Sequence, residues 1–141
     1  MTSDALDVNK WGKEVQKVAG NGKIAISMWF LLHEISRAKP ENLIKFFGDI
    51  HSMFPSSPIA VGEVVCQGEE VLLGNKDKSL MPEYLFFHEM SGQGILLWKE
   101  YRHVLENIPY ELAYEQLFDE APDGKGSKVP STFVWCLVPK K

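Results

Sequence analysis

Two segments of the sequence place a His-Glu pair in the same apolar setting, which raises the question of a shared site. Residues 29–36 read WFLLHEIS and residues 84–91 read YLFFHEMS. A zinc protease helix requires the spacing His-Glu-x-x-His, which sets two imidazoles one turn apart with the glutamate as base. Here the residue four positions after His33 is arginine, and the residue four positions after His88 is glycine. Neither copy can therefore form such a zinc site by itself.

We interpret the doubled motif as a coincidence of two segments that each pass from the core to solvent. A helix is predicted over 24–38 and a strand over 83–90, so the two copies have no common local geometry. The alternative is a metal or ligand site in which His33, His88 and the glutamates beside them converge through the tertiary fold. Such convergence of four ligands without local spacing is uncommon, and coincidence is preferred.

The sequence lacks the local motifs of several other chemistries. A phosphate loop needs Gly-Lys-Ser/Thr, but Lys23 is followed by isoleucine. A dinucleotide loop needs Gly-x-Gly-x-x-Gly. Gly92 and Gly94 match its first two glycines, but leucine stands at the third position, residue 97. The nucleophile elbow Gly-x-Ser-x-Gly lacks both glycines around Ser91. Cys66 and Cys136 lie in apolar runs and are predicted to be small buried hydrophobic residues.

The strongest charge bias is acidic and lies near the C-terminus, where residues 100–124 carry seven acidic side chains and one arginine. A helix is predicted over 110–120, because its apolar residues recur every three or four positions. Its acidic residues recur along one flank, where like charges four residues apart repel each other. An acidic ridge kept against this preference indicates a basic partner, although a plain solvated face is the alternative. The predicted partner-binding residues are Glu111, Glu115, Asp119, Glu120 and Asp123.

The remaining elements define the fold class. Helices are predicted over 8–18, from 40 to 54 and over 95–108, and strands over 59–66, 70–73 and 132–138, with the first two strands forming a hairpin. Two alternatives remain open, namely a strand over 23–30 and a strand over 95–99. The sequence thus predicts a single α+β domain, residues 1–141, with a mostly antiparallel sheet of about four to five strands packed against three to five helices.

Composition narrows the location and the partners. The chain has 141 residues, of which 45% are apolar and 24% charged, as in an ordinary globular domain. The net charge is −4 and no Lys/Arg-rich run occurs, which disfavours nucleic acid as a partner. The longest apolar run is about half of a bilayer span, and the N-terminus has no signal-peptide pattern. A cytoplasmic protein without a membrane partner is predicted.

These observations together predict a non-catalytic intracellular protein-binding domain that needs no cofactor. Its most concrete form is an inhibitor or immunity-type protein that covers a basic surface of a toxin or nuclease. The alternative is a small enzyme, or a metal- or ligand-binding domain, whose histidines and carboxylates are assembled by the fold. A third possibility is a homodimer whose interface buries aromatic residues such as Trp29 and Trp98.

Overall fold

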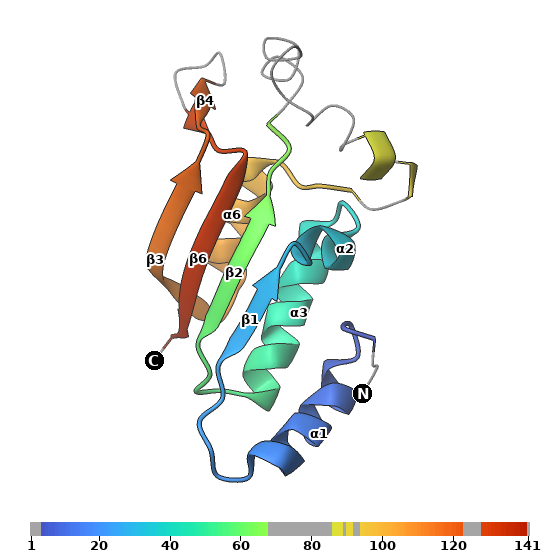
Figure 1. Cartoon of the computed structure of the whole chain (residues 1–141), viewed down its shortest axis with the longest axis vertical. Coiled ribbons are helices and arrows are strands. Elements are labelled where there is room, and N and C mark those ends of the chain that lie inside the picture. The colour runs from blue at the N-terminus through green and yellow to red at the C-terminus, as the bar shows by residue number, and fades with distance from the viewer. Residues whose placement is uncertain (1–3, 68–85, 89, 92–93, 123–127, 141) are drawn as a thin grey trace.

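The computed structural model describes residues 4–67, 86–88, 90–91, 94–122 and 128–140, and it has an α+β fold, as predicted (Figure 1). The helices are α1 (Val8–Ala19), α2 (Leu32–Ser36), α3 (Pro40–Met53) and α6 (Trp98–Asn107). The strands are β1 (Ile26–Trp29), β2 (Ile59–Val64), β3 (Tyr110–Phe118), β4 (Ala121–Pro122), β5 (Lys128–Val129) and β6 (Thr132–Pro139). No helix in the described part of the chain is long and apolar enough to cross a membrane.

The main sheet has the strand order β1-β2-β6-β3, and β4 and β5 pair separately. β1 runs parallel to β2, whereas β6 runs antiparallel to both β2 and β3. Because parallel neighbours need a long crossover, the chain between β1 and β2 forms α2 and α3 before it returns to the sheet. The sheet is therefore mixed, with one parallel pair in an otherwise antiparallel arrangement.

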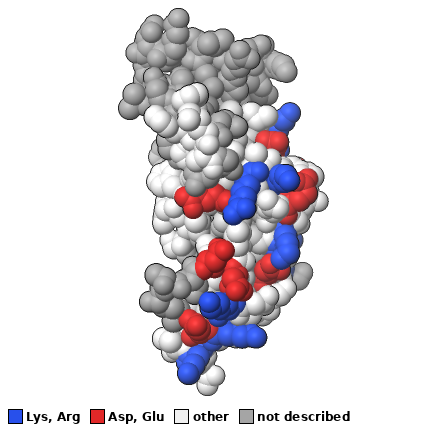
Figure 2. Space-filling view, turned by 90° about the vertical axis from the view of Figure 1, so that its right-hand side faces the viewer, with Lys and Arg blue, Asp and Glu red and all other residues white. Residues whose placement is uncertain are grey.

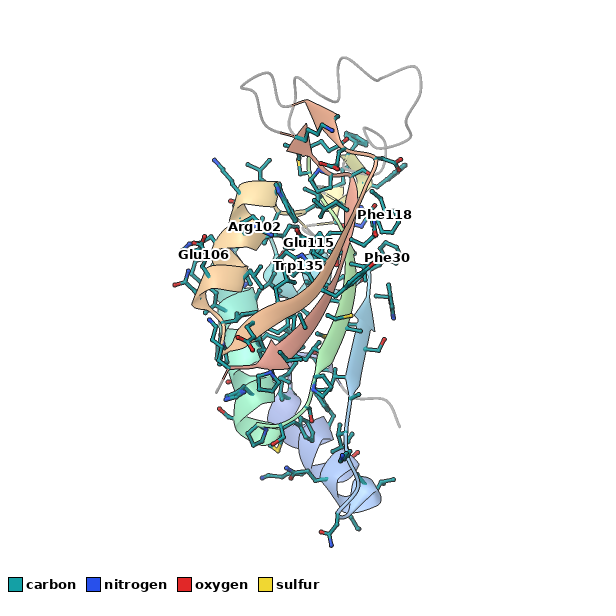
Figure 3. All side chains as sticks on the ribbon, turned by 90° about the vertical axis from the view of Figure 1, so that its left-hand side faces the viewer. Phe30, Arg102, Glu106, Glu115, Phe118 and Trp135 are labelled. Carbon is teal, nitrogen blue, oxygen red and sulfur yellow. The ribbon has the colours of Figure 1, made fainter. Side chains whose placement is uncertain are left out.

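The helices α3 and α6 cover one face of this sheet, and the opposite face carries no helix of the described chain (Figures 1 and 3). The helix predicted from 40 to 54 is confirmed as α3, which starts with proline and buries Leu43, Phe46, Phe47 and Ile50. α1 packs on α3, and the Trp11 ring stacks 5.8 Å from that of Phe54. The Asp7 side chain caps α1 by accepting a hydrogen bond from the Lys10 backbone N–H.

An aromatic cluster joins α6 to β6. The Phe133 and Trp135 rings have centroids 4.2 Å apart, and Tyr101 lies 4.9 Å from Phe133. Trp98 adds a further ring 5.5 Å from Phe133. Alternate residues of β6 therefore face the helices, and the strand predicted at the C-terminal end is confirmed.

Two predicted helices are wrong. The segment predicted as one helix over 24–38 is strand β1 followed by α2, so the alternative of a strand over 23–30 was closer. The change occurs at Phe30, whose φ of 51° cannot belong to a right-handed helix. The segment predicted as a helix over 110–120 is strand β3. Its apolar spacing imitates a helix because of the bulge between Leu112 and Tyr114, which shifts the alternation by one residue.

The middle of the chain also departs from the prediction. Both edges of β2 are occupied, by β1 and β6, so β2 has no free edge for a hairpin with 70–73, which lies outside the described residues. Of the strand predicted over 83–90, residues 86–88 and 90 are helical, and the rest is outside the described chain. The helix predicted over 95–108 is confirmed as α6, while the alternative strand over 95–99 is reduced to a single bridge from Leu97.

Candidate functional site

The candidate site lies where the parallel strands β1 and β2 end. In open sheets with parallel strands, ligands bind outside the carboxyl ends of those strands. The backbone N–H of Phe30 still donates to the Gly62 carbonyl at 2.8 Å, after which the left-handed residue Phe30 turns the chain out of the sheet. This turn begins α2 directly beyond the end of β1. The first turn of α2 therefore lies beside the last residues of β2 (Figure 1).

A buried histidine and a buried glutamate meet at this point. His33, from α2, is 3% exposed, and Glu63, from β2, is fully buried. The Nδ1 atom of His33 lies 3.0 Å from Oε1 of Glu63. The same carboxylate accepts hydrogen bonds from the backbone N–H of His33 at 3.2 Å and from that of Val64 at 2.8 Å. Burial of a carboxylate requires such partners, and Glu63 has three of them.

The contact defines the chemistry that His33 can perform. Because the Glu63 carboxylate only accepts hydrogen bonds, it selects the tautomer that carries the proton on Nδ1. The lone pair of the imidazole then lies on Nε2. A histidine held in this way by a buried carboxylate can accept a proton at Nε2, and the carboxylate stabilises the imidazolium that forms.

The second histidine of the doubled motif reaches the same place. The ring of His88 lies edge-on to that of His33, with centroids 4.8 Å apart and planes at 75°. The interpretation of the two motifs as a coincidence is therefore wrong for the histidines, which meet through the tertiary fold. The interpretation as a coincidence holds for Glu34, which is exposed and is not the carboxylate that pairs with His33. Glu89 is outside the described residues. Within the described chain, no group of three or more His, Cys, Asp or Glu side chains is arranged to hold a metal ion.

The C-terminal end of α2 is fixed against the segment that precedes α6. The buried Ser36 hydroxyl lies within hydrogen-bond distance of the carbonyls of His33 and Gly94, at 3.0 and 3.2 Å. The backbone N–H of Ala38 donates to the Gly94 carbonyl at 3.3 Å. These contacts bind α2 to a distant part of the chain, so His33 has a defined position relative to the sheet.

Glu63 is the site residue that sequence reasoning missed. A signal was present, because Glu63 is the only charged residue in the apolar run from Ile59 to Val65. A charge in the middle of an apolar strand must either face solvent or have a buried partner. Register decides between the two, and Glu63 stands opposite the buried Phe133 on the face covered by helices.

The predicted acidic ridge is divided by the structure. Glu111 stands opposite Val138 on the open face of the sheet, whereas Glu115 stands opposite the buried Trp135 on the helix-covered face. Glu115 accepts hydrogen bonds from Arg102 at 2.6 Å and from the Trp135 indole N–H at 3.0 Å (Figure 3). These two acids therefore do not form one surface, because the bulge in β3 changes which residues face each side.

The other predicted partner-binding residues lie beyond the strand. Asp119, at a φ of 46°, and Glu120 are exposed after β3, and Asp123 lies outside the described residues. On the side of the molecule formed by α1, α2 and α3, acidic and basic side chains are interspersed (Figure 2). That the five acids bind a basic partner stays a prediction, without the shared ridge on which it was based.

Comparison with known proteins gives a likeness in fold. No protein-family model and no curated protein matches the sequence. Among solved structures, a SAM-dependent methyltransferase from Methanosarcina mazei is similar, with a TM-score of 0.50 and 15% sequence identity. The match covers 82% of this chain and 58% of the methyltransferase chain, so this chain corresponds to little more than half of that protein. At this identity the likeness concerns the fold alone.

This likeness corrects the predicted function. A fold shared with an enzyme, together with a buried histidine–carboxylate pair at the strand ends, contradicts the prediction of a non-catalytic inhibitor or immunity-type protein. That prediction depended on an acidic helix over 110–120, and the segment is instead a strand with its acids on two faces. The chain is thus similar in fold to part of a SAM-dependent methyltransferase. At its strand ends it holds a histidine paired with a buried carboxylate.

Proposed function

We propose that this chain takes part in methyl transfer from S-adenosylmethionine, with His33 as the general base and Glu63 as the residue that positions it. The observation that carries the proposal is the buried contact of 3.0 Å between His33 Nδ1 and Glu63 Oε1 at the carboxyl ends of two parallel strands. The fold likeness to a SAM-dependent methyltransferase supports it, although 42% of that chain has no counterpart here, since the match covers 58%.

The chemistry of methyl transfer gives His33 a defined task. The donor supplies a methyl group on a positively charged sulfur, which leaves with the electron pair of the broken C–S bond. An acceptor hydroxyl or amine that takes up the methyl group must lose a proton. His33 Nε2 receives that proton, and the Glu63 carboxylate stabilises the resulting imidazolium. General-base catalysis of this kind contributes on the order of 10²–10⁴-fold in rate.

The described residues fit the acceptor side of such a site better than the donor side. His33 offers the base, and the ring of His88 lies against it, with ring centroids 4.8 Å apart. The glycine-rich turn that receives a nucleotide at the end of a strand was not found in the sequence. In this proposal the donor is a substrate of the chain.

The acceptor class follows from the apolar side chains around the histidines. Residues 86–88 and 90 include His88 and also expose Phe86, Phe87 and Met90, which are 60, 66 and 71% exposed. Exposed apolar groups beside a buried polar pair suit an apolar molecule with one ionisable hydroxyl. We therefore propose a small apolar or phenolic acceptor.

A cytoplasmic location remains part of this proposal. Cys66 and Cys136 are free thiols. Thiols persist in the reduced state in the cytosol, where disulfides are rare.

The test combines donor binding with transfer. Calorimetry would first measure binding of S-adenosylmethionine and of its demethylated product. Transfer of a radiolabelled methyl group to a panel of simple phenols and aliphatic alcohols would then be compared between wild type and His33→Asn. The expected result is binding of the donor and a loss of transfer on the order of 10²-fold or more in the variant.

A matched variant identifies effects that come from the site. His103→Asn changes an exposed histidine on α6, on a different element from the site, and is expected to retain wild-type transfer. Glu63→Gln should lower transfer without changing donor affinity, because the amide no longer selects the Nδ1–H tautomer. Absence of donor binding, or equal transfer by wild type and His33→Asn, would contradict the proposal.

A further inference from the structure

The face of the sheet opposite the helices is largely apolar across three strands, and Gln116 and Thr132 are its uncharged polar residues. β6 contributes Val134 and Cys136, both half-buried, and β3 contributes Tyr114 and Phe118, which are 53% and 44% exposed. Phe30 and Phe118 both project from this side of the sheet, away from Arg102 and Glu106 on α6 (Figure 3). The described strands place a single charged side chain, Glu111, at one corner of this face.

The sequences of β2 and β6 are those of strands that are buried on both faces. Strands with one solvated face alternate apolar and polar residues, whereas strands buried on both faces are apolar throughout. β2 reads IAVGEV and β6 reads TFVWCLVP, so their outward positions are as apolar as their inward ones, apart from Thr132 and the inward Glu63. Contiguous apolar patches of a few hundred Å² are often functional surfaces.

We propose that this face binds the same face of a second copy of the chain. A two-fold axis that runs along β6 would set β6 on β6 of the partner copy and β3 on β2 of the partner copy, because β2 and β3 flank β6 on either side. Packed sheets lie about 10 Å apart, which is the distance that the outward side chains must fill.

The strand register makes the two faces complementary in size. Tyr114 and Ala60 both stand beside Cys136, so the axis sets the tyrosine of one copy over the alanine of the other. Phe118 and Val64 both stand beside Thr132, which sets a phenylalanine over a valine. Large side chains thus meet small ones on both outer strands.

The aromatic ring of Trp29 completes this arrangement. It leans over Gly62, where a Cβ atom would overlap the ring, and its indole N–H donates to Ser27 Oγ at 2.7 Å. Gly62 shares its position along β6 with Gln116, through Val134. The ring of one copy therefore lies over Gln116 of the other, between Tyr114 and Phe118.

The charges on this face permit a second copy as the occupant, and the area of the face limits the strength of the dimer. Glu111 lies on the β3 side of the axis, so the two copies of it stand on opposite sides and no like charges face each other. The face is three strands wide, at about 4.8 Å between strands, and about six residues long, at about 3.3 Å per residue. Its projected area is therefore roughly 300 Å² per copy. This is below the ~800 Å² per partner of standard interfaces, so the expected dimer is weak and reversible, as transient interfaces are.

Sedimentation velocity from about 5 to about 500 µM tests for such a weak dimer. The expected result is a mass that doubles with concentration for wild type and a monomer at all concentrations for Tyr114→Glu/Phe118→Glu. Circular dichroism checks that the variant folds. Phe87→Glu is the matched control, since Phe87 is exposed but lies off the sheet, and it should dimerise as wild type does.

Cross-linking tests the axis in a chain with an unaltered apolar face. A short bismaleimide should join two copies of Cys66→Ser through Cys136, which faces its own copy across the axis, and should not join copies of Cys136→Ser. Three results would overturn the proposal. They are a wild-type monomer at about 500 µM, a dimer that survives Tyr114→Glu/Phe118→Glu because it pairs through the free edge of β1, and a failure of Cys136 to cross-link in the dimer.

Discussion

Replacement of Glu63 by alanine should destabilise the fold strongly, because it removes the acceptor of three buried hydrogen bonds. The carboxylate accepts from the His33 backbone at 3.2 Å, from His33 Nδ1 at 3.0 Å and from the Val64 backbone at 2.8 Å. Each buried donor left unpaired costs about 1–3 kcal/mol. The three donors share one acceptor, and removal of one partner from a buried ion pair costs about 3–5 kcal/mol, so the expected loss in unfolding free energy is about 3–5 kcal/mol. That is a large part of the ~5–15 kcal/mol by which domains are stable.

Urea denaturation followed by circular dichroism measures this loss, provided that the slope of the transition is unchanged. Glu34→Ala is the matched control, since Glu34 is an exposed glutamate of α2 beside His33, and it should remain within about 0.5 kcal/mol of wild type. A double-mutant cycle with His33→Phe should give a coupling of about 0.5–3 kcal/mol. A loss below about 1 kcal/mol for Glu63→Ala, or additive effects in the cycle, would show that the buried pair does not exist as described.

Two further substitutions test other parts of the fold. The Tyr110 hydroxyl is buried without a hydrogen-bond partner among the described residues, and burial raises the pKa of Tyr110 to about 12. In the unfolded chain the Tyr110 hydroxyl loses its proton from about pH 10, so wild-type stability should fall by up to about 2.7 kcal/mol between pH 10 and 12. Tyr110→Phe has no such proton and should lack this fall. Denaturation of both proteins at pH 8 and at pH 11 measures the difference. Gly94→Ala should cost about 1–3 kcal/mol, since its Cβ would overlap that of Ala38 and lie 3.0 Å from the Ala38 Cα. The matched Gly48→Ala, inside α3 and with no atom within 4 Å, should instead gain about 0.5–1 kcal/mol, and equal stability of the two variants would contradict the packing at Gly94.

Local patterns were enough to predict the elements that begin or end on strong signals. The Asp7 cap and Gly20 bound α1, and Pro40 starts α3, because caps and prolines act through the nearest turn of the backbone. The α+β class followed from the order of such elements. β3 could not be recognised, because the bulge beside Ala113 gives its apolar residues a spacing close to that of a helix, and only pairing with β6 distinguishes the two.

The candidate site was hidden for a different reason. His33 and Glu63 are 30 residues apart, and His33 and His88 are farther apart still. Their contacts depend on the parallel register of β1 and β2 and on the path of the chain after Phe30, neither of which leaves a local motif. The doubled His-Glu was therefore a correct pointer to the two histidines and a misleading one to the glutamates, since the carboxylate that pairs with His33 belongs to β2.

The position of the pair also bears on its purpose. A carboxylate on the buried face of a central strand is expensive to fold, and an apolar side chain opposite Phe133 would serve the core at lower cost. Its partner must come from the element that covers that end of the sheet, which is α2, because β1 leaves the sheet one residue before Glu63 is reached in register. Places where local preference is violated and then compensated are expected at functional sites. Glu63 is hydrogen-bonded to one imidazole nitrogen of His33, and the other nitrogen, Nε2, is left to accept a proton. A general base therefore fits this pair better than a purely structural hydrogen bond does.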